Sequence, residues 1–315
     1  MKVLVTGVSG QLGFDVVREL DARGIEAKGV GLEDFSLTDY EAMRRFVEDY
    51  RPTAIIHCAA YTAVDKAEDE PELCRAVNAA ATGELAHLAR EIGAKFLYIS
   101  TDYVFPGTGE NFYEPMDETS PCNVYGASKL LGEEAAKKEL AELFIVRISW
   151  VFGENGKNFI KTMLQLAETH EELSVVGDQI GSPTYTKDLA RLLADMIVTE
   201  KYGTYHATNE GTCSWAELAA EALRLAGKKT RVRAIPTEAY PTKAKRPKNS
   251  RLSKKCLDEA GFSRLPDWHD AVARYVRELE SFESTTNMAH IRRGLDAFKA
   301  GKFVKHDLIE ETDSN

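Results

Sequence analysis

The amino-acid sequence predicts an α/β protein built on a doubly wound parallel sheet, with a smaller mixed α/β domain after it. Short apolar runs alternate with helix-like segments through residues 1–150, and three glycines follow the first apolar run at three-residue intervals. Strands that alternate with helices form a parallel sheet covered on both faces. The regular alternation loosens after Trp150, which predicts a change of architecture there.

The first element is predicted to be a buried strand that runs through a glycine turn into a helix. Residues 3–5 are Val-Leu-Val, and Gly7, Gly10 and Gly13 follow as the helix opens. Glycine lets a backbone turn tightly and lie against a pyrophosphate, while the free N–H groups of a helix N-terminus attract its charge. In this strand-turn-helix context, the spacing predicts a Rossmann-type dinucleotide site.

The following elements continue the alternation. Thr38, with Glu41 three residues later, matches a capping box and predicts the start of the second helix. The expected elements are a strand at 25–30, a helix at 38–51, a strand at 54–58, a helix at 71–92, a strand at 95–100, a helix at 124–138 and a strand at 143–148.

The second part of the chain is predicted to be less regular. Ser214 with Glu217 matches another capping box, and two prolines, Pro241 and Pro247, predict a loop at 240–251. The other expected elements are a helix at 158–169, a strand at 173–176, a helix at 186–199 and a strand at 204–207.

Three regions are expected. They are a dinucleotide-binding domain at 1–150, to which 184–207 return, a substrate domain at 151–280, and an appendage at 281–315. The appendage is predicted as a polar linker, 281–287, and an amphipathic helix with Ile291, Leu295 and Phe298 on its apolar side.

Composition argues against several classes of function. A net charge of −10 argues against a broad surface for nucleic acid or for an anionic membrane, since both need excess Lys and Arg. No apolar run approaches the roughly 20 residues of a membrane span, and no signal segment precedes the first strand. Five scattered cysteines without a C-x-x-C pair favour a reducing cytoplasm over disulfides or structural zinc.

Tyr125 and Lys129 are the leading candidates for chemistry. A four-residue separation places the phenol and the ammonium on one face of a helix, where the ammonium is expected to lower the pKa of the phenol. The alternative is a core tyrosine beside a solvated lysine. Ser100 and Thr101 end the preceding strand, where ligands of open α/β sheets bind, although they could simply terminate it. His57 is expected to be a core histidine.

Several motifs together resemble the extended short-chain dehydrogenase/reductase family, and within it the reductases of dTDP-linked keto sugars. The resemblance covers residues 1–280. Its motifs are T-G-x-x-G-x-x-G at 6–13, A-A-Y-T-A-V-D-K-A-E at 59–68, S-T-D-Y-V-F-P-G at 100–107, N-V-Y-G-A-S-K at 123–129, S-W-V-F-G at 149–153, D-Q-I-G-S-P-T at 178–184 and R-P-K-N-S-R-L at 246–252.

The resemblance implies roles for individual residues. Tyr125 would protonate the reacting oxygen, Lys129 would position it and the cofactor's ribose, and Thr101 would replace the serine of many relatives. Further cofactor contacts would come from Gly7, Gly10, Gln11, Leu12, Gly13, Asp34, Phe35, Ala59, Ala60, Tyr61 and Thr62. Substrate contacts would come from Val64, Thr101, Asp102, Tyr103, Trp150, Arg246 and Arg251, the two arginines near a diphosphate.

The implied reaction is NAD(P)H-dependent reduction of the C4 keto group of dTDP-4-dehydro-β-L-rhamnose to dTDP-L-rhamnose. Glu33 and Asp34 favour NADH, yet the family accepts both cofactors, and we expect NADPH with NADH as the alternative. No catalytic metal is expected; magnesium at an oligomer contact and a homodimer are left open. The rival functions are a reductase or epimerase of another nucleotide sugar, or a non-catalytic dinucleotide-binding regulatory subunit.

Overall fold

The computed structural model describes residues 1–281. Met1–Tyr275 form one compact unit, and a second unit begins at Val276. Residues 268–275 of the first unit and 276–281 of the second are helical. The linker and the amphipathic helix expected beyond residue 281 lie outside the described residues. The division of the chain at residue 150 stays a prediction.

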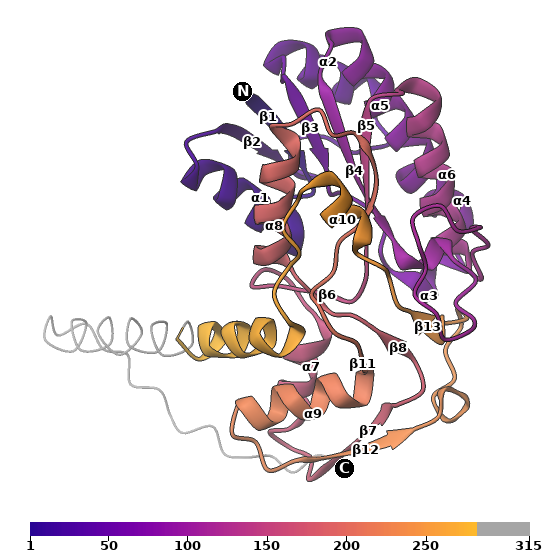
Figure 1. Ribbon diagram of the computed structural model, residues 1–315. Helices are drawn as coiled ribbons and strands as arrows, with labels where there is room; N and C mark the ends of the chain where they lie inside the picture. Colours follow the sequence, from indigo (N-terminus) through magenta and orange to yellow (C-terminus); the bar gives the residue numbers. More distant parts are fainter. Residues whose placement is uncertain (282–315) are drawn as a thin grey trace, which may run out of the picture. The chain divides into compact units, whose positions relative to one another are not determined.

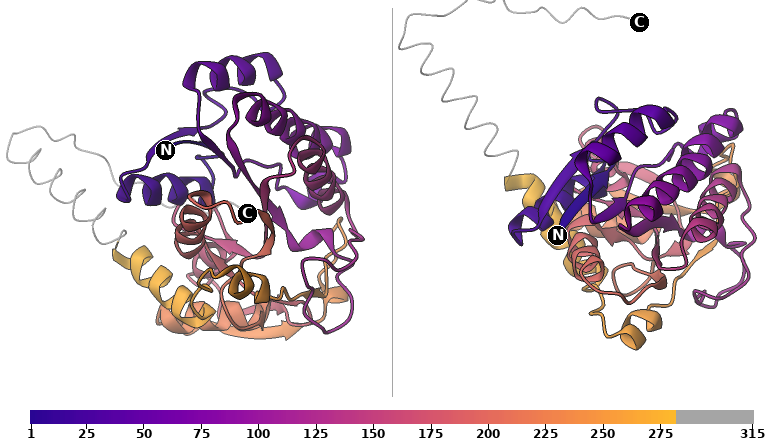
Figure 2. Two further views of the ribbon diagram at one scale, coloured as in Figure 1. Left: turned by 45° about the horizontal axis from the view of Figure 1, so that its top comes forward. Right: turned by 90° about the horizontal axis from the view of Figure 1, so that it is seen from above.

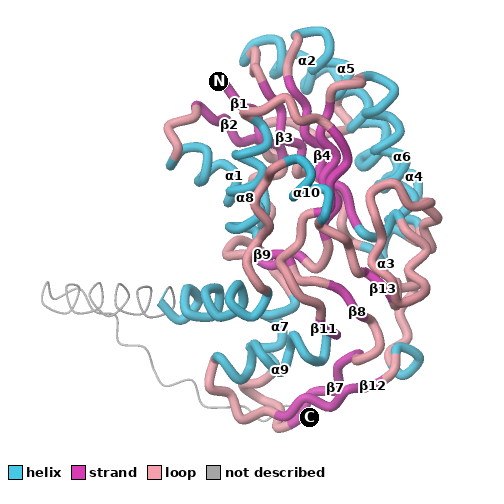
Figure 3. The backbone as a smooth tube through the Cα atoms, in the orientation of Figure 1, coloured by secondary structure: helices cyan, strands magenta, loops and turns pink. Residues whose placement is uncertain are grey.

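A six-stranded parallel sheet forms the centre of the first unit (Figures 1 and 3). Its strands lie in the order β10-β5-β4-β3-β1-β2, with every neighbouring pair parallel. The bounds are β1 Lys2–Thr6, β2 Glu26–Val30, β3 Ala54–His57, β4 Lys95–Thr101, β5 Leu143–Ile148 and β10 Gly203–His206. The parallel α/β fold predicted from the alternation of elements is therefore confirmed.

Helices cover both faces of this sheet (Figure 2). Successive side chains of a strand point to opposite faces, so Val3 and Val5 join one buried cluster and Leu4 joins the other. The first cluster includes side chains of α1 (Gln11–Ala22), α8 (Thr186–Ile197) and α10 (Lys255–Ala260). The second includes side chains of α2 (Tyr40–Tyr50), α5 (Ala81–Ile92) and α6 (Val124–Glu139).

The remaining elements form smaller sheets and helices, apart from the central strands in Figure 3. The small sheets pair β6 (Val151–Phe152) with β9 (Thr184–Tyr185), β7 (Glu172–Val176) with β12 (Arg231–Ile235), and β8 (Ile180–Gly181) with both β11 (Cys213–Ser214) and β13 (Asn249–Ser250). The other helical segments are α3 Val64–Ala67, α4 Pro71–Arg75, the π-helical η1 Ala76–Ala80, the 3-10 turns η2 Asp102–Val104 and η3 Thr237–Ala239, α7 Phe159–Leu166 and α9 Trp215–Leu225.

Two local expectations were wrong and one was right. The second helix begins at Tyr40, and its cap is Asp39, whose carboxylate accepts from Ala42 N, not Thr38. The single helix expected at 71–92 contains the π-helical turn η1. By contrast, α9 carries the predicted capping box of Ser214 and Glu217.

A buried ion pair joins Arg147 of β5 to Glu133 of α6. The guanidinium of Arg147 donates to both oxygens of Glu133, at 2.8 and 2.7 Å, and Ser100 donates to the same carboxylate at 2.6 Å. The two charged side chains are 3% and 0% exposed. Removing one partner of such a pair leaves the other charge buried and unpaired.

Arg147→Met is therefore expected to lower the free energy of unfolding by about 3–5 kcal/mol, because Glu133 loses its counter-charge. Urea unfolding followed by circular dichroism measures this loss. The control is Arg44→Met, which removes an exposed arginine from a surface group of carboxylates and should have a much smaller effect. Equal losses in the two variants would contradict the assignment.

Candidate active site

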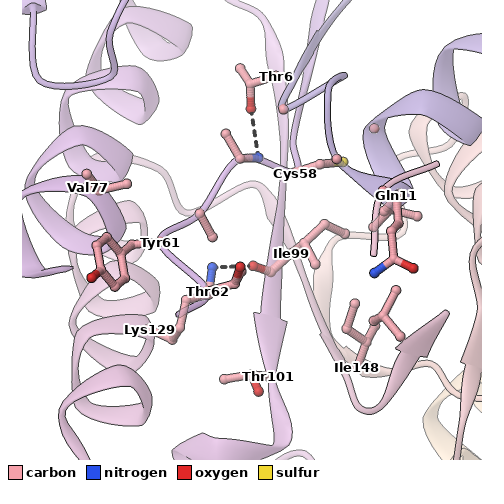
Figure 4. A pocket seen from close by; sticks show the side chains of 18 of the residues that line it. Thr6, Gln11, Cys58, Tyr61, Thr62, Val77, Ile99, Thr101, Lys129 and Ile148 are labelled. Carbon is pink, nitrogen blue, oxygen red and sulfur yellow. Dashed lines mark hydrogen bonds between the residues drawn. The ribbon is translucent and has the colours of Figure 1, made fainter. Parts of the chain in front are cut away.

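A cavity of about 830 Å³ lies at the carboxyl ends of the central strands. Its wall combines the turn after β1, the loop after β3, the end of β4, the start of α6 and the residues after β5. In Figure 4, Tyr61 and Lys129 lie on one side of this cavity and Gln11 on the other, with Ile99 and Thr101 between them. Elements far apart in the sequence thus meet at one edge of the sheet.

The glycine turn after β1 has no room for side chains. Gly7 has a φ of +77°, and a Cβ there would lie 2.7 Å from the backbone of Ala59. A Cβ on Gly13 would overlap the carbonyl oxygen of Gly7. Helix α1 begins with Gly10 as its cap and no side-chain cap, so its first N–H groups are left for another acceptor. This cradle fits the pyrophosphate of a dinucleotide.

Helix α6 is docked so that Tyr125 and Lys129 both line the cavity. Asn123 caps the helix by accepting from Gly126 N at 2.7 Å, and Glu68 accepts from Val124 N at 2.9 Å. Gly126 allows the helix to lie against the backbone of the segment after β4, because a Cβ would overlap the Tyr103 carbonyl.

Tyr125 lies beside Thr101, which ends β4. Thr101 is buried; its hydroxyl donates to Asp102 Oδ1 at 3.0 Å and accepts from Tyr103 N at 3.2 Å. Burial raises the pKa of Tyr125, against the smaller opposing effect of Thr101. The expected lowering of this pKa by Lys129 was wrong, because desolvation dominates and keeps the phenol protonated at neutral pH.

Lys129 is only 3% exposed. Its ammonium donates to the Ile99 carbonyl at 2.7 Å, as Figure 4 shows, and lies 4.1 Å from the ring centre of Tyr98. Burial lowers the pKa of Lys129 to about 7, although Glu133 acts in the opposite direction. The side chain is therefore poised to exchange a proton near neutral pH.

Buried polar groups connect the cradle to the loop after β3. His57 Nδ1 lies 2.7 Å from the Thr6 hydroxyl, and His57 Nε2 lies 3.2 Å from the Thr82 hydroxyl. Because Thr82 donates to Asn78 O, the histidine is assigned as donor at Nε2 and acceptor at Nδ1. Burial lowers the pKa of His57 to about 3, so it is neutral, as expected of a core histidine.

Asn78 holds this loop from the π-helical turn η1. Its side chain accepts from Tyr61 N at 2.7 Å and donates to Tyr61 O at 3.0 Å. It also donates to the Ser128 hydroxyl on α6 at 2.9 Å. One amide therefore fixes the loop relative to the helix that carries Tyr125 and Lys129.

Aromatic and charged side chains complete the outer wall. Trp150 stacks on Trp215, with ring centres 3.8 Å apart, and has a left-handed φ of +49° that is unusual for a bulky residue. Asp102 is buried, one of its oxygens lacks a hydrogen-bond partner, and burial raises its pKa to about 6. Arg246 reaches the cavity from a distant loop.

The structure brings most of the expected residues to this wall, with two exceptions. Asp34 lies outside it and accepts from Gly31 N at 2.9 Å, whereas Phe35 lines the cavity. Arg251 lines a second cavity of about 770 Å³. The expected residues on the wall are Gly7, Gly10, Gln11, Leu12, Gly13, Phe35, Ala59, Ala60, Tyr61, Thr62, Val64, Thr101, Asp102, Tyr103, Tyr125, Lys129, Trp150 and Arg246.

Sequence reasoning missed Trp215, Ile99 and Ile148, which also line the cavity. Trp215 follows the cap of α9, but nothing in the local sequence indicates that this helix start reaches the wall. Ile99 and Ile148 look like ordinary core positions of two strands, and only the termination of those strands at the cavity exposes them to it.

Within residues 1–281, no group of three or more His, Cys, Asp or Glu side chains could hold a metal ion. Across the same residues, no helix combines the length and apolar character that crossing a membrane requires.

Comparisons with known proteins agree on one family. The family model described as the RmlD substrate binding domain matches residues 1–281. A dTDP-4-dehydrorhamnose reductase of Escherichia coli is 41% identical, covering 89% of this chain and 98% of that protein. A spore coat polysaccharide biosynthesis protein of Bacillus subtilis, SpsK, is 40% identical, covering 89% of this chain and 98% of that protein.

Solved structures of dTDP-4-dehydrorhamnose reductases also superpose on this chain. A dTDP-4-dehydrorhamnose reductase of Clostridium acetobutylicum superposes with a TM-score of 0.87 at 39% identity, covering 89% of this chain and 100% of that one. The Bacillus anthracis reductase, solved in complex with NADP, has a TM-score of 0.86 at 41% identity, covering 88% and 100%.

The buried ammonium predicts a pH-dependent gain in stability for Lys129→Met. Below pH 7, Lys129 is protonated in both the folded and unfolded states, and the folded state carries the full cost of burying it. Between the folded pKa of about 7 and the unfolded value near 10.4, the folded lysine is neutral while the unfolded lysine is still charged, so this cost falls steadily with rising pH and is gone above about pH 10.4. The variant should exceed the parent by roughly 1–3 kcal/mol at pH 6 and by much less at pH 10.

Urea unfolding at the two pH values tests this expectation. Lys138→Met, an exposed position on the same helix, is the control and should show no such dependence. A stability difference between the Lys129 variant and its parent that stays constant with pH would show that the ammonium is not destabilised by burial.

Proposed function

The chain belongs to the dTDP-4-dehydrorhamnose reductase family of NAD(P)H-dependent oxidoreductases, and we propose that Tyr125, Thr101 and Lys129 assist the reduction by NAD(P)H of the C4 keto group of dTDP-4-dehydro-β-L-rhamnose, which gives dTDP-L-rhamnose. The observation that carries this proposal is the meeting of these three side chains on the wall of one cavity, beside a glycine cradle. The regulatory-subunit alternative would need neither the tyrosine nor the lysine at this place.

The cradle supports binding of the cofactor. The N–H groups at the start of α1 would bind the pyrophosphate, since Gly7, Gly10 and Gly13 leave the backbone open to it. Phe35 would hold the adenine and residues 59–62 the nicotinamide, because these residues line the same cavity. The reduced nicotinamide supplies a hydride when bound. NADP in the Bacillus anthracis relative supports NADPH as the cofactor here, with NADH as the alternative.

The proton for the C4 oxygen comes from Tyr125. Burial keeps its hydroxyl protonated at neutral pH, which is the form a general acid requires. Thr101 lies beside that hydroxyl and orients it. Lys129 lies one helical turn from Tyr125 and would position the cofactor's ribose, and burial lowers the pKa of its ammonium to about 7.

The substrate fits the outer wall. The hexose packs on the side of Trp150 and Tyr103, with Val64 and Asp102 beside it. The diphosphate lies at Arg246, which borders both cavities, and the nucleoside extends toward the second cavity and Arg251. Guanidinium groups match the geometry of phosphate oxygens, so two arginines along this path suit a nucleoside diphosphate.

We propose a cytoplasmic setting for the enzyme. Five free cysteines support a reducing cytoplasm. A homodimer, with or without magnesium at its contact, stays a prediction.

Tyr125→Phe is expected to lower kcat at least about 100-fold, because it removes the general acid. The disappearance of NADPH absorbance after addition of the keto sugar nucleotide measures turnover, and NADPH fluorescence measures cofactor binding, which should be retained. The control is Tyr50→Phe, a hydroxyl on α2 that bonds only weakly to Val3 O. Turnover near that of the parent would refute the assignment of Tyr125.

Substrate choice is tested by supplying 4-keto sugars linked to dTDP, UDP and GDP in competition, with NADPH and then with NADH. We expect the dTDP sugar to have the highest kcat/KM and NADPH to be the better donor. Preferential reduction of a UDP or GDP sugar would move the assignment to another nucleotide-sugar reductase.

A further inference from the structure

Asp65, at the start of α3, binds a loop from the other end of the sequence with both carboxylate oxygens. Its Oδ1 accepts from Ala244 N at 2.9 Å, and its Oδ2 accepts from Arg246 Nη2 at 2.6 Å. The Arg246 side chain is 21% exposed and that of Asp65 is 45% exposed. The carboxylate therefore fixes the loop backbone and the arginine head group together.

Arg246 occupies the junction of the two cavities, since it lines both. On its other side, Nη1 lies 3.4 Å from the Tyr103 hydroxyl, and the Tyr103 ring meets Tyr125 edge to face with ring centres 5.5 Å apart. A guanidinium carries five N–H donors. The contacts with Asp65 and Tyr103 occupy only part of this set, so donors are left for an anion at the junction.

We propose that Asp65 is the positioning residue for diphosphate recognition: it holds the Arg246 guanidinium at the junction of the two cavities, where a nucleoside diphosphate sugar crosses from one cavity to the other. The inference rests on the proposed function, because the reacting sugar must reach Tyr125 in the first cavity while the nucleoside occupies the second. Asp65 acts through Arg246 and touches neither the sugar nor the cofactor.

Two effects of the carboxylate oppose each other. Its negative charge repels a diphosphate, but its contacts spare the arginine and the loop the entropy of being ordered when the ligand binds. Asp65 is nearly half exposed, so solvent screens the repulsion, whereas its two short hydrogen bonds fix the geometry directly. Positioning is therefore the larger effect.

The same loop offers a matched control. Lys243 contacts Asp69, so a second ion pair joins the segment after α3 to this loop. Neither Asp69 nor Lys243 lines either cavity. Asp69→Asn thus removes a carboxylate of similar exposure, near Asp65 in sequence, without disturbing Arg246.

The experiment titrates the full-length chain with dTDP by calorimetry, comparing the parent with Asp65→Asn, Asp69→Asn, Arg246→Gln and the double variant of Asp65 and Arg246. Asparagine keeps an oxygen for Ala244 N but loses the charge that binds Arg246. We expect Asp65→Asn to weaken dTDP binding about 10-fold and Asp69→Asn less than about 2-fold. The double variant should be no weaker than Arg246→Gln alone, because Asp65 acts through that arginine.

Kinetics supply a readout that general damage to the fold would not reproduce. Asp65→Asn should raise KM for the sugar nucleotide about 10-fold and leave kcat within about 2-fold, with NADPH affinity unchanged. Equal or tighter dTDP binding by Asp65→Asn, additive losses in the double variant, or a fall in kcat alone would overturn the inference.

Parallel titrations with UDP and GDP separate this inference from the proposed function. If the parent prefers UDP or GDP, the assignment to dTDP fails and Asp65 is judged with the preferred diphosphate. If the parent binds none of the three, both the proposed function and the role of Asp65 are refuted.

Discussion

The site depends on a close approach of backbone to backbone at the glycine turn. Gly7 lies against the backbone of Ala59, and Gly13 lies against the carbonyl of Gly7. These contacts bring the ends of β1 and β3 together and let α1 start directly beneath the cavity. A side chain at either glycine would separate the strand ends, and the N–H groups of the helix would no longer face the same space as Tyr125. The close packing of these backbone atoms is therefore required for the chemistry of the site.

Buried polar side chains link the glycine turn to the loop after β3 by hydrogen bonds. Leaving any of them unpaired would destabilise the fold. Thr6, His57 and Thr82 form one hydrogen-bonded line, and Asn78 extends it to the loop at Tyr61. Buried polar groups stabilise a unique arrangement only when their partners are present. Lys129 contrasts with them, since its ammonium donates a hydrogen bond to Ile99 O while burial lowers its pKa. The hydrogen-bonded side chains thus stabilise the fold, whereas burial of the Lys129 ammonium destabilises it.

The sequence was informative wherever a local pattern determines the outcome. Parallel strands end at one edge of a sheet, so Thr101 and Tyr125 could be placed together from their positions after a strand and at the start of a helix. The predicted cap at Thr38 was wrong because Asp39, one residue later, accepts the capping hydrogen bond from Ala42 N. The predicted lowering of the Tyr125 pKa was wrong because the burial that raises this pKa is a property of the assembled fold. Trp215 and the pairing of Asp65 with Arg246 depend on contacts across the chain, which local patterns do not contain.

Strand β10 has a consequence for the order in which the protein is built. It pairs with β5 at the border of the sheet, yet residues 149–202 lie between the two strands in sequence. While the chain emerges from the ribosome, β5 therefore waits with an unpaired edge until 203–206 have been synthesised. Such distant pairing slows folding and leaves an exposed edge to which another chain could add. The six-stranded sheet is therefore complete only after the segments that carry Trp150 and α7 have left the ribosome.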